Sequence, residues 1–109
     1  MKRSTSFAFV SAALLALPAI AQDLPGDPVK GHQLARQICS ECHYVDRNWA
    51  DLYVFEAPSF VDVAQHSDHT EMSLRVFLVT PHDRMPNVIL TRPEMDDVIS
   101  WILSLRQEQ

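Results

Sequence analysis

Residues 39 to 43, Cys-Ser-Glu-Cys-His, contain both cysteines of the chain, and a histidine follows the second one directly. Two thiols separated by two residues occur in three kinds of site: a redox-active disulfide, a zinc site and a covalently attached haem. The rest of the sequence discriminates among these three chemistries.

A redox-active disulfide needs a first thiol with a lowered pKa, which thioredoxin-like proteins obtain by placing the motif at the start of a helix. Here the apolar periodicity before Cys39 predicts that the motif lies at the end of a helix. The chain also lacks the alternation of strands and helices in which such a motif is found. The sequence therefore disfavours dithiol chemistry.

A zinc site would need two further ligands, and His66 and His69 could supply them in a C-x2-C…H-x2-H pattern. Sites of this kind usually have three to five residues between the histidines. The shorter spacing in this chain strains tetrahedral closure around the metal. Zinc is therefore disfavoured as well.

Haem attachment accounts for every position of the motif. The thiols of Cys39 and Cys42 can form thioether bonds with the two vinyl groups on one edge of the porphyrin, and His43 is then held beneath the iron as an axial ligand. The C-x-x-C-H pattern is typical of c-type haem attachment. We expect one covalent haem c, which also gives a short chain a large apolar body to pack around.

A second axial ligand would close the remaining position of the iron. The side chains that could bind there are Met72, Met85, Met95, His32, His66, His69 and His82. Met72 and Met95 follow helical apolar periodicity and are predicted to fill the core. Met85 lies in a polar loop, and Pro86 restricts it to an extended backbone conformation. Met85 is therefore favoured, with His82 as the main alternative, and the other histidines are predicted to lie at the surface.

The motif is expected to follow a helix that has Asp27 as its N-cap and Pro28 as its first residue. Small and apolar residues share one face of this helix at the 3.6-residue period: Gly31, Leu34, Ala35, Ile38 and Cys42. Because Gly31 and Ala35 are small and four residues apart, another helix can approach closely at this face.

Two more helical segments are expected in the middle of the chain. Pro58-Ser59 can open a short helix that continues to Gln65, with Phe60, Val63 and Ala64 on one side. Residues 70–79 fit a strand as well as a helix, and Pro81 ends the element in either case.

The last segment has the clearest pattern. Thr91 and Glu94 form a capping box, which predicts the start of a helix that ends near Arg106. Its broad apolar face consists of Met95, Val98, Ile99, Trp101, Ile102 and Leu105. With almost no strand signal elsewhere, the chain is predicted to be a small all-α domain.

Residues 1–21 have the features of a secretory signal peptide: a positive start at Lys2 and Arg3, an apolar run, and small residues at Ala19 and Ala21. The run is too short to span a bilayer, which takes about 20 apolar residues. We expect cleavage after Ala21, which leaves residues 22–109 as one domain without stable membrane insertion.

The residues after the expected cleavage site carry seven basic and 14 acidic side chains, and their formal net charge is −7. This charge argues against binding to nucleic acid and to anionic membranes. It suits partner proteins with basic docking surfaces, although solubility alone would also explain it.

These features resemble the class I monohaem cytochromes c, especially the small bacterial ones. The resemblance covers nearly all of residues 27–106 and rests on the motif at 39–43, on Ala57-Pro58-Ser59-Phe60, on Met85-Pro86 and on the C-terminal amphipathic helix. It implies the cytochrome c fold, in which three to four short helices wrap around one covalently bound haem. It also implies that residues 70–79 are helical.

The resemblance implies roles for single residues too. Gly31 would pack against Trp101 where the first and last helices cross, and Met85 matches the Met-Pro step that carries the family's axial methionine. The backbone oxygen of Pro58 would accept a hydrogen bond from His43, although Ala57 stands where glycine is frequent in the family. The residues considered for the haem environment and its propionates are Trp49, Arg47 and Arg84, and for the arginines a solvated surface position is preferred.

Taken together, these patterns predict a periplasmic electron carrier rather than an enzyme, with His43 and Met85 as axial ligands and redox proteins as partners. One alternative is the haem subunit of a periplasmic dehydrogenase or oxidase complex, which would have the same chemistry. The other is a gas-binding haem protein in which Met85 is not bound to the iron.

Overall fold

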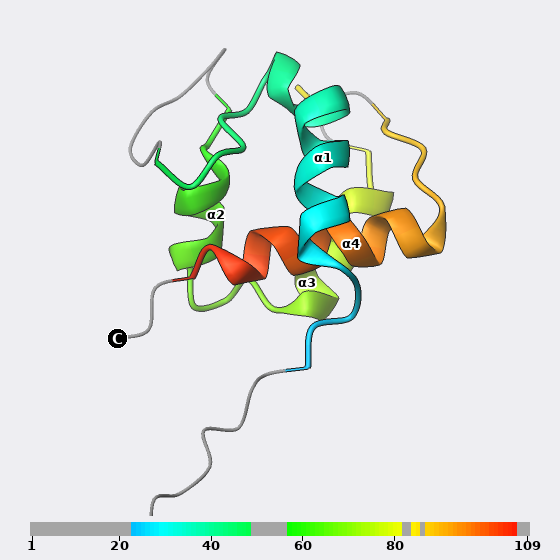
Figure 1. The fold of residues 1–109 in the computed structure, drawn as a ribbon. Coiled ribbons are helices and arrows are strands. Elements are labelled where there is room, and N and C mark those ends of the chain that lie inside the picture. The colour runs from blue at the N-terminus through cyan, green and yellow to red at the C-terminus, as the bar shows by residue number, and fades with distance from the viewer. Residues whose placement is uncertain (1–22, 49–56, 82–83, 86, 107–109) are drawn as a thin grey trace, which may run out of the picture.

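The computed structural model describes residues 23–48, 57–81, 84–85 and 87–106. These residues form four α-helices and one 3-10 turn, and no strand is found among them (Figure 1). The elements are α1 (Pro28–Ile38), η1 (Cys39–Glu41), α2 (Phe60–Gln65), α3 (Glu71–Val79) and α4 (Arg92–Ser104). The all-α prediction is confirmed, and the ambiguous residues 70–79 are helical. The predicted signal peptide, residues 1–21, lies outside the described residues.

Each α-helix begins with a side chain that accepts a hydrogen bond from a backbone N–H of the first turn, as free N–H groups at a helix start require. Asp27 and Thr91 do so at the two predicted caps, and Thr91 and Glu94 form the complete capping box. Ser59 caps α2, and Thr70 caps α3. Thr80 ends α3 in an extended conformation directly before Pro81, as expected for a residue before proline.

Helices α1 and α4 cross in direct contact, as Figure 1 shows. A Cβ atom added at Gly31 would lie 1.8 Å from the carbonyl oxygen of Asp97 and 2.4 Å from its carbonyl carbon. The predicted close approach at Gly31 is therefore confirmed, with the α4 backbone as the nearest group. Trp101, which was expected at Gly31, stacks on the ring of the next residue, His32, at 4.1 Å between ring centroids.

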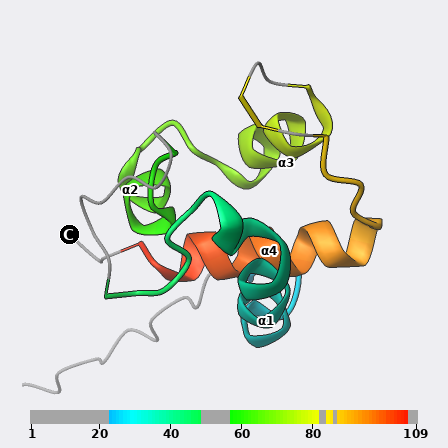
Figure 2. The same cartoon turned by 90° about the horizontal axis from the view of Figure 1, so that it is seen from above.

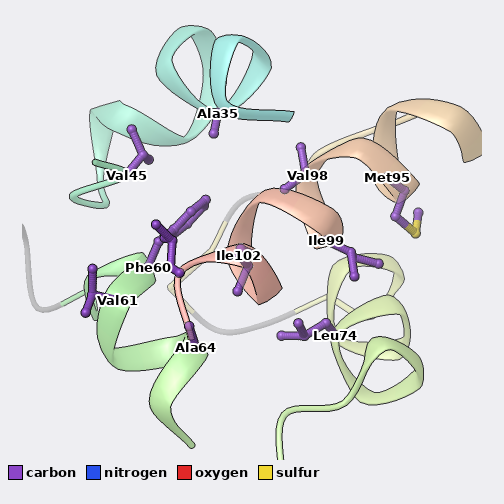
Figure 3. Packing of buried hydrophobic residues seen from close by; sticks show 11 residues of the cluster. Ala35, Val45, Phe60, Val61, Ala64, Leu74, Met95, Val98, Ile99 and Ile102 are labelled. Atoms are coloured by element: carbon purple, nitrogen blue, oxygen red, sulfur yellow. The ribbon is translucent and has the colours of Figure 1, made fainter. Parts of the chain in front are cut away.

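The core lies along α4. Seen from above, α1 and α3 lie on opposite sides of α4 (Figure 2). Figure 3 shows apolar side chains from α1, α2, α3 and α4 pointing toward one another. The buried cluster consists of Ala35, Val45, Phe60, Val61, Ala64, Leu74, Met95, Val98, Ile99, Ile102 and Leu105. Met95 is buried as predicted, and α4 joins the other three helices into one body.

Met72 departs from its prediction. It was expected to fill the core, but it is 67% exposed, and the buried residue of α3 is Leu74. Helical periodicity shows which side chains share a face, but it does not show whether that face meets the core. Among the described residues, no helix has the length and apolar character that would let it cross a membrane.

Candidate functional site

The Cys-Ser-Glu-Cys-His motif forms a tight turn at the C-terminal end of α1. The helix ends at Ile38, and η1 continues through the first three residues of the motif. The carbonyl oxygen of Cys39 accepts hydrogen bonds from the backbone N–H of Cys42 at 3.1 Å and of His43 at 2.9 Å. The turn thus presents two thiols and an imidazole on one short piece of backbone, as the sequence predicted.

Cys39 and Cys42 form no disulfide with each other, and both are partly buried. Burial raises the pKa of the Cys39 thiol to about 11. A redox-active dithiol requires the opposite shift, because only the thiolate attacks a disulfide. The structure therefore gives a second reason against the dithiol interpretation.

The ring of His43 is held by one hydrogen bond. Its Nδ1 lies 2.7 Å from the backbone oxygen of Pro58. Because a carbonyl oxygen can only accept, Nδ1 donates the hydrogen and Nε2 keeps its lone pair. This is the arrangement found for histidines that bind metals, whose second nitrogen is fixed by a carbonyl or carboxylate. The contact with Pro58 that the resemblance implied is present, even though Ala57 replaces the frequent glycine.

The four residues after His43 are each bonded to a helix. The backbone oxygen of Tyr44 accepts a hydrogen bond from Phe60 N of α2, and that of Val45 accepts one from Trp101 Nε1 of α4, both at 2.8 Å. Asp46 Oδ1 pairs with His32 Nε2 of α1 at 2.5 Å. The guanidinium of Arg47 donates to Ser104 O of α4 at 3.3 Å. These contacts fix the segment to α1, α2 and α4. Its position, and that of the adjacent His43, is therefore set by three helices.

His32 was predicted to be a surface residue, and the structure corrects this. It is half-buried, stacks on Trp101 and pairs with Asp46. Arg47 lies over the Trp101 ring, 5.6 Å from its centroid. No sequence pattern indicated this cluster, because its members come from three separate segments and each type is common at a protein surface.

Met85 lies in the connection between α3 and α4, at a bend, and is half-buried. In Figure 1 the segment at 84–85 (yellow) and η1 lie on the same side of α4. Figure 2 shows the segment at 84–85 on the α3 side and η1 on the α1 side. Arg84 is exposed. Trp49, His82 and Pro86 lie outside the described residues.

The described residues do not bring together the four side chains of the C-x2-C…H-x2-H pattern. No group of three or more histidine, cysteine, aspartate or glutamate side chains gathers there in a way that could hold a metal ion. The rings of His66 and His69 lie 5.0 Å apart, but the two cysteines do not join them. His69 is half-buried and its Nδ1 bonds to Val63 O at 2.7 Å, whereas His66 is exposed as predicted.

The residues present fit a haem c. Two thiols stand on one turn, and an imidazole with a free Nε2 lone pair follows them. The centroids of the Phe60 and His43 rings lie 5.5 Å apart, which gives the imidazole an apolar neighbour. The thiols can form the thioether bonds to a porphyrin, and the imidazole nitrogen can bind its iron.

Comparison with known proteins decides the family. Over 83 residues the chain is 37% identical to cytochrome c-552 of Bradyrhizobium diazoefficiens, and the match covers 76% of this chain and 79% of that protein. The chain belongs to the small c-type cytochromes. No protein-family model and no solved structure gives a significant match. For this cytochrome, family membership implies haem c as the cofactor and electron transport as the role, and it confirms the resemblance inferred from the motif.

Proposed function

We propose that this cytochrome is a periplasmic electron carrier with a single haem, attached through Cys39 and Cys42 and coordinated by His43 and Met85. When bound, the haem supplies one-electron transfer, since its iron alternates between the ferrous and ferric states. Such a carrier makes and breaks no substrate bond, so we propose that it is not an enzyme. The observation that carries the proposal is the 2.7 Å contact between His43 Nδ1 and Pro58 O, because it leaves Nε2 available beside two thiols.

The protein's own contribution is to hold the ligand still. The hydrogen bond to Pro58 fixes the ring orientation and the tautomer of His43. The contacts of residues 44–47 with α1, α2 and α4 keep the adjacent backbone in place. A ligand that moves little between the two oxidation states suits electron transfer.

Met85 is proposed as the second axial ligand for three reasons. It is half-buried rather than solvent-exposed, it lies in a connection rather than in a helix face, and Pro86 restricts its backbone. A thioether ligand favours the ferrous state and raises the reduction potential. A ligand at this position also closes the iron to gases, which separates a carrier from a gas-binding protein.

The periplasmic location follows from the signal-peptide features of residues 1–21. Haem attachment to a C-x-x-C-H motif is consistent with secretion across the inner membrane. We propose that the partners are redox proteins with basic docking surfaces, because the chain has a formal net charge of −5, and −7 without residues 1–21.

The axial ligand can be tested by absorption spectra of the purified protein in both oxidation states. The wild type is expected to show the weak far-red band of a methionine–ferric bond, and Met85→Ala is expected to lose it. Met72→Ala is the matched control, because Met72 is 67% exposed, and it should keep the band. The reduced Met85→Ala variant should also bind carbon monoxide rapidly, whereas the wild type should not.

An unchanged far-red band in Met85→Ala would rule out this ligand. Rapid carbon monoxide binding by the wild type would favour the gas-binding alternative. A wild-type protein that elutes with a stable partner in size-exclusion chromatography would favour the complex-subunit alternative.

A further inference from the structure

Helix α3 carries a row of exposed apolar side chains. Met72 is 67% exposed, Val76 54% and Val79 60%. Their spacing of four and three residues places them on one face of the helix, and we call them the α3 stripe. Single exposed apolar residues are normal at protein surfaces, but a contiguous group on one face is typical of an interaction site.

The α3 stripe lies on the side of the helix that faces away from the core. Leu74 is buried, and Leu78 packs against the buried cluster. Figure 3 shows Leu74 pointing from α3 into the cluster. Each leucine is two residues from Val76, which places it on nearly the opposite side of the helix from that residue. A haem held on the core side of α3 would therefore leave the α3 stripe exposed to solvent.

Helix α3 is fixed to the rest of the protein. The guanidinium of Arg75 donates hydrogen bonds to Glu71 Oε1 at 3.0 Å and to Asp96 Oδ1 of α4 at 2.5 Å. Thr70 caps the start of the helix. The α3 stripe is thus presented on an anchored helix, which lowers the conformational entropy that docking would cost.

The charges near the α3 stripe indicate what could cover it. Asp68 and Glu71 are exposed at the start of α3, and the positive charge of Arg75 is shared between two carboxylates. The whole chain has a formal net charge of −5. A second copy of this protein, or an anionic lipid surface, would bring like charges together. A partner with an apolar centre and a basic rim is complementary.

We propose that the α3 stripe is the docking surface for a redox partner protein whose contact face has an apolar centre bordered by lysine or arginine. This inference rests on the proposed function, because it gives the electron carrier a place to dock. Helix α3 ends at Val79 and leads into the connection that contains Met85. A partner on α3 therefore lies next to the segment proposed to supply the axial methionine.

The test uses the reduced holoprotein and follows its oxidation by washed membranes and by soluble extract of the source cells. The variant changes all three stripe residues to glutamine, Met72→Gln, Val76→Gln and Val79→Gln. The matched control is Val29→Gln on α1, where the side chain is 64% exposed. We expect the triple variant to raise the KM about fivefold or more without changing kcat, because apolar contact area with the partner is lost. The control should keep the wild-type KM.

Oxidation by ferricyanide separates this proposal from the proposed function. If ferricyanide oxidises the wild type and the triple variant equally, the haem and its redox chemistry are intact in both. An unchanged KM of the triple variant, or a wild type that neither cell fraction oxidises, would then overturn the docking proposal alone. The docking proposal would also be overturned by sedimentation that shows a wild-type dimer and its loss in the triple variant. Flotation of the wild type with phosphatidylglycerol vesicles would overturn it too. A wild type that ferricyanide cannot oxidise would contradict the proposed function instead.

Discussion

The imidazole of His43 depends on contacts from distant parts of the chain. Pro58 orients its ring, and the segment after it is bonded to His32, Phe60 and Trp101. The residue types of the proposed haem site and their spacing were predictable, because Cys-x-x-Cys-His is a local pattern. The hydrogen bonds that hold this segment were not predictable, since a bond between segments far apart in sequence leaves no local signal. Trp101 is an example: it was expected at Gly31, and its ring stacks on His32 and donates to Val45.

Gly31 gives a prediction at this scale. Gly31→Ala should lower the free energy of unfolding by about 1–3 kcal/mol, because its Cβ would overlap the Asp97 backbone and the two helices would have to separate. Urea unfolding of the holoprotein measures this loss. Gln33→Ala on the exposed side of α1 is the control and should stay within about 0.5 kcal/mol of the wild type. Equal stability of the two variants would show that the helices do not touch at Gly31.

At the scale of elements, the helix starts were the most predictable feature. Asp27-Pro28 and the Thr91–Glu94 box act through side chains within a few residues of each other, so the sequence alone carries the signal. The orientation of a helix face was less predictable. Met72 has the periodicity of a core residue, but the side of α3 that meets α4 carries Leu74 instead. Only the packing of the other helices decides between the two faces.

The capping box of α4 predicts a dependence of stability on pH. Hydrogen bonds from the backbone N–H and the hydroxyl of Thr91 lower the pKa of Glu94 below its ordinary value. The folded state therefore binds this proton less tightly than the unfolded state, so the contribution is complete above the ordinary glutamate pKa. It is lost as the pH falls through the lowered pKa of the folded state.

Glu94→Gln should therefore be less stable than the wild type at neutral pH, and this difference should shrink in acid. Unfolding in urea at a series of pH values measures it. Glu41→Gln is the control, since Glu41 is exposed and far from α4 in sequence. A difference that stays constant down to acidic pH would show that the charge of Glu94 does not contribute to the cap.

At the scale of the whole molecule, the fold is built around helix α4, and the proposed haem site is built around the Cys-Ser-Glu-Cys-His motif. Helix α4 packs against α1, α2 and α3, and the thiols and His43 stand where α1 ends. The all-α architecture followed from the lack of strand signal and from the caps. The exposed α3 stripe did not follow from composition or charge, because its position on the outer face depends on how the helices pack.

The central claim is that one haem is bound permanently to Cys39 and Cys42. Its most direct test is the mass of the acid-denatured polypeptide, purified from a host that assembles c-type cytochromes. We predict the mass of the chain from residue 22 plus one haem, with no thiol left to titrate. A polypeptide of unmodified mass with two titratable thiols would contradict the account.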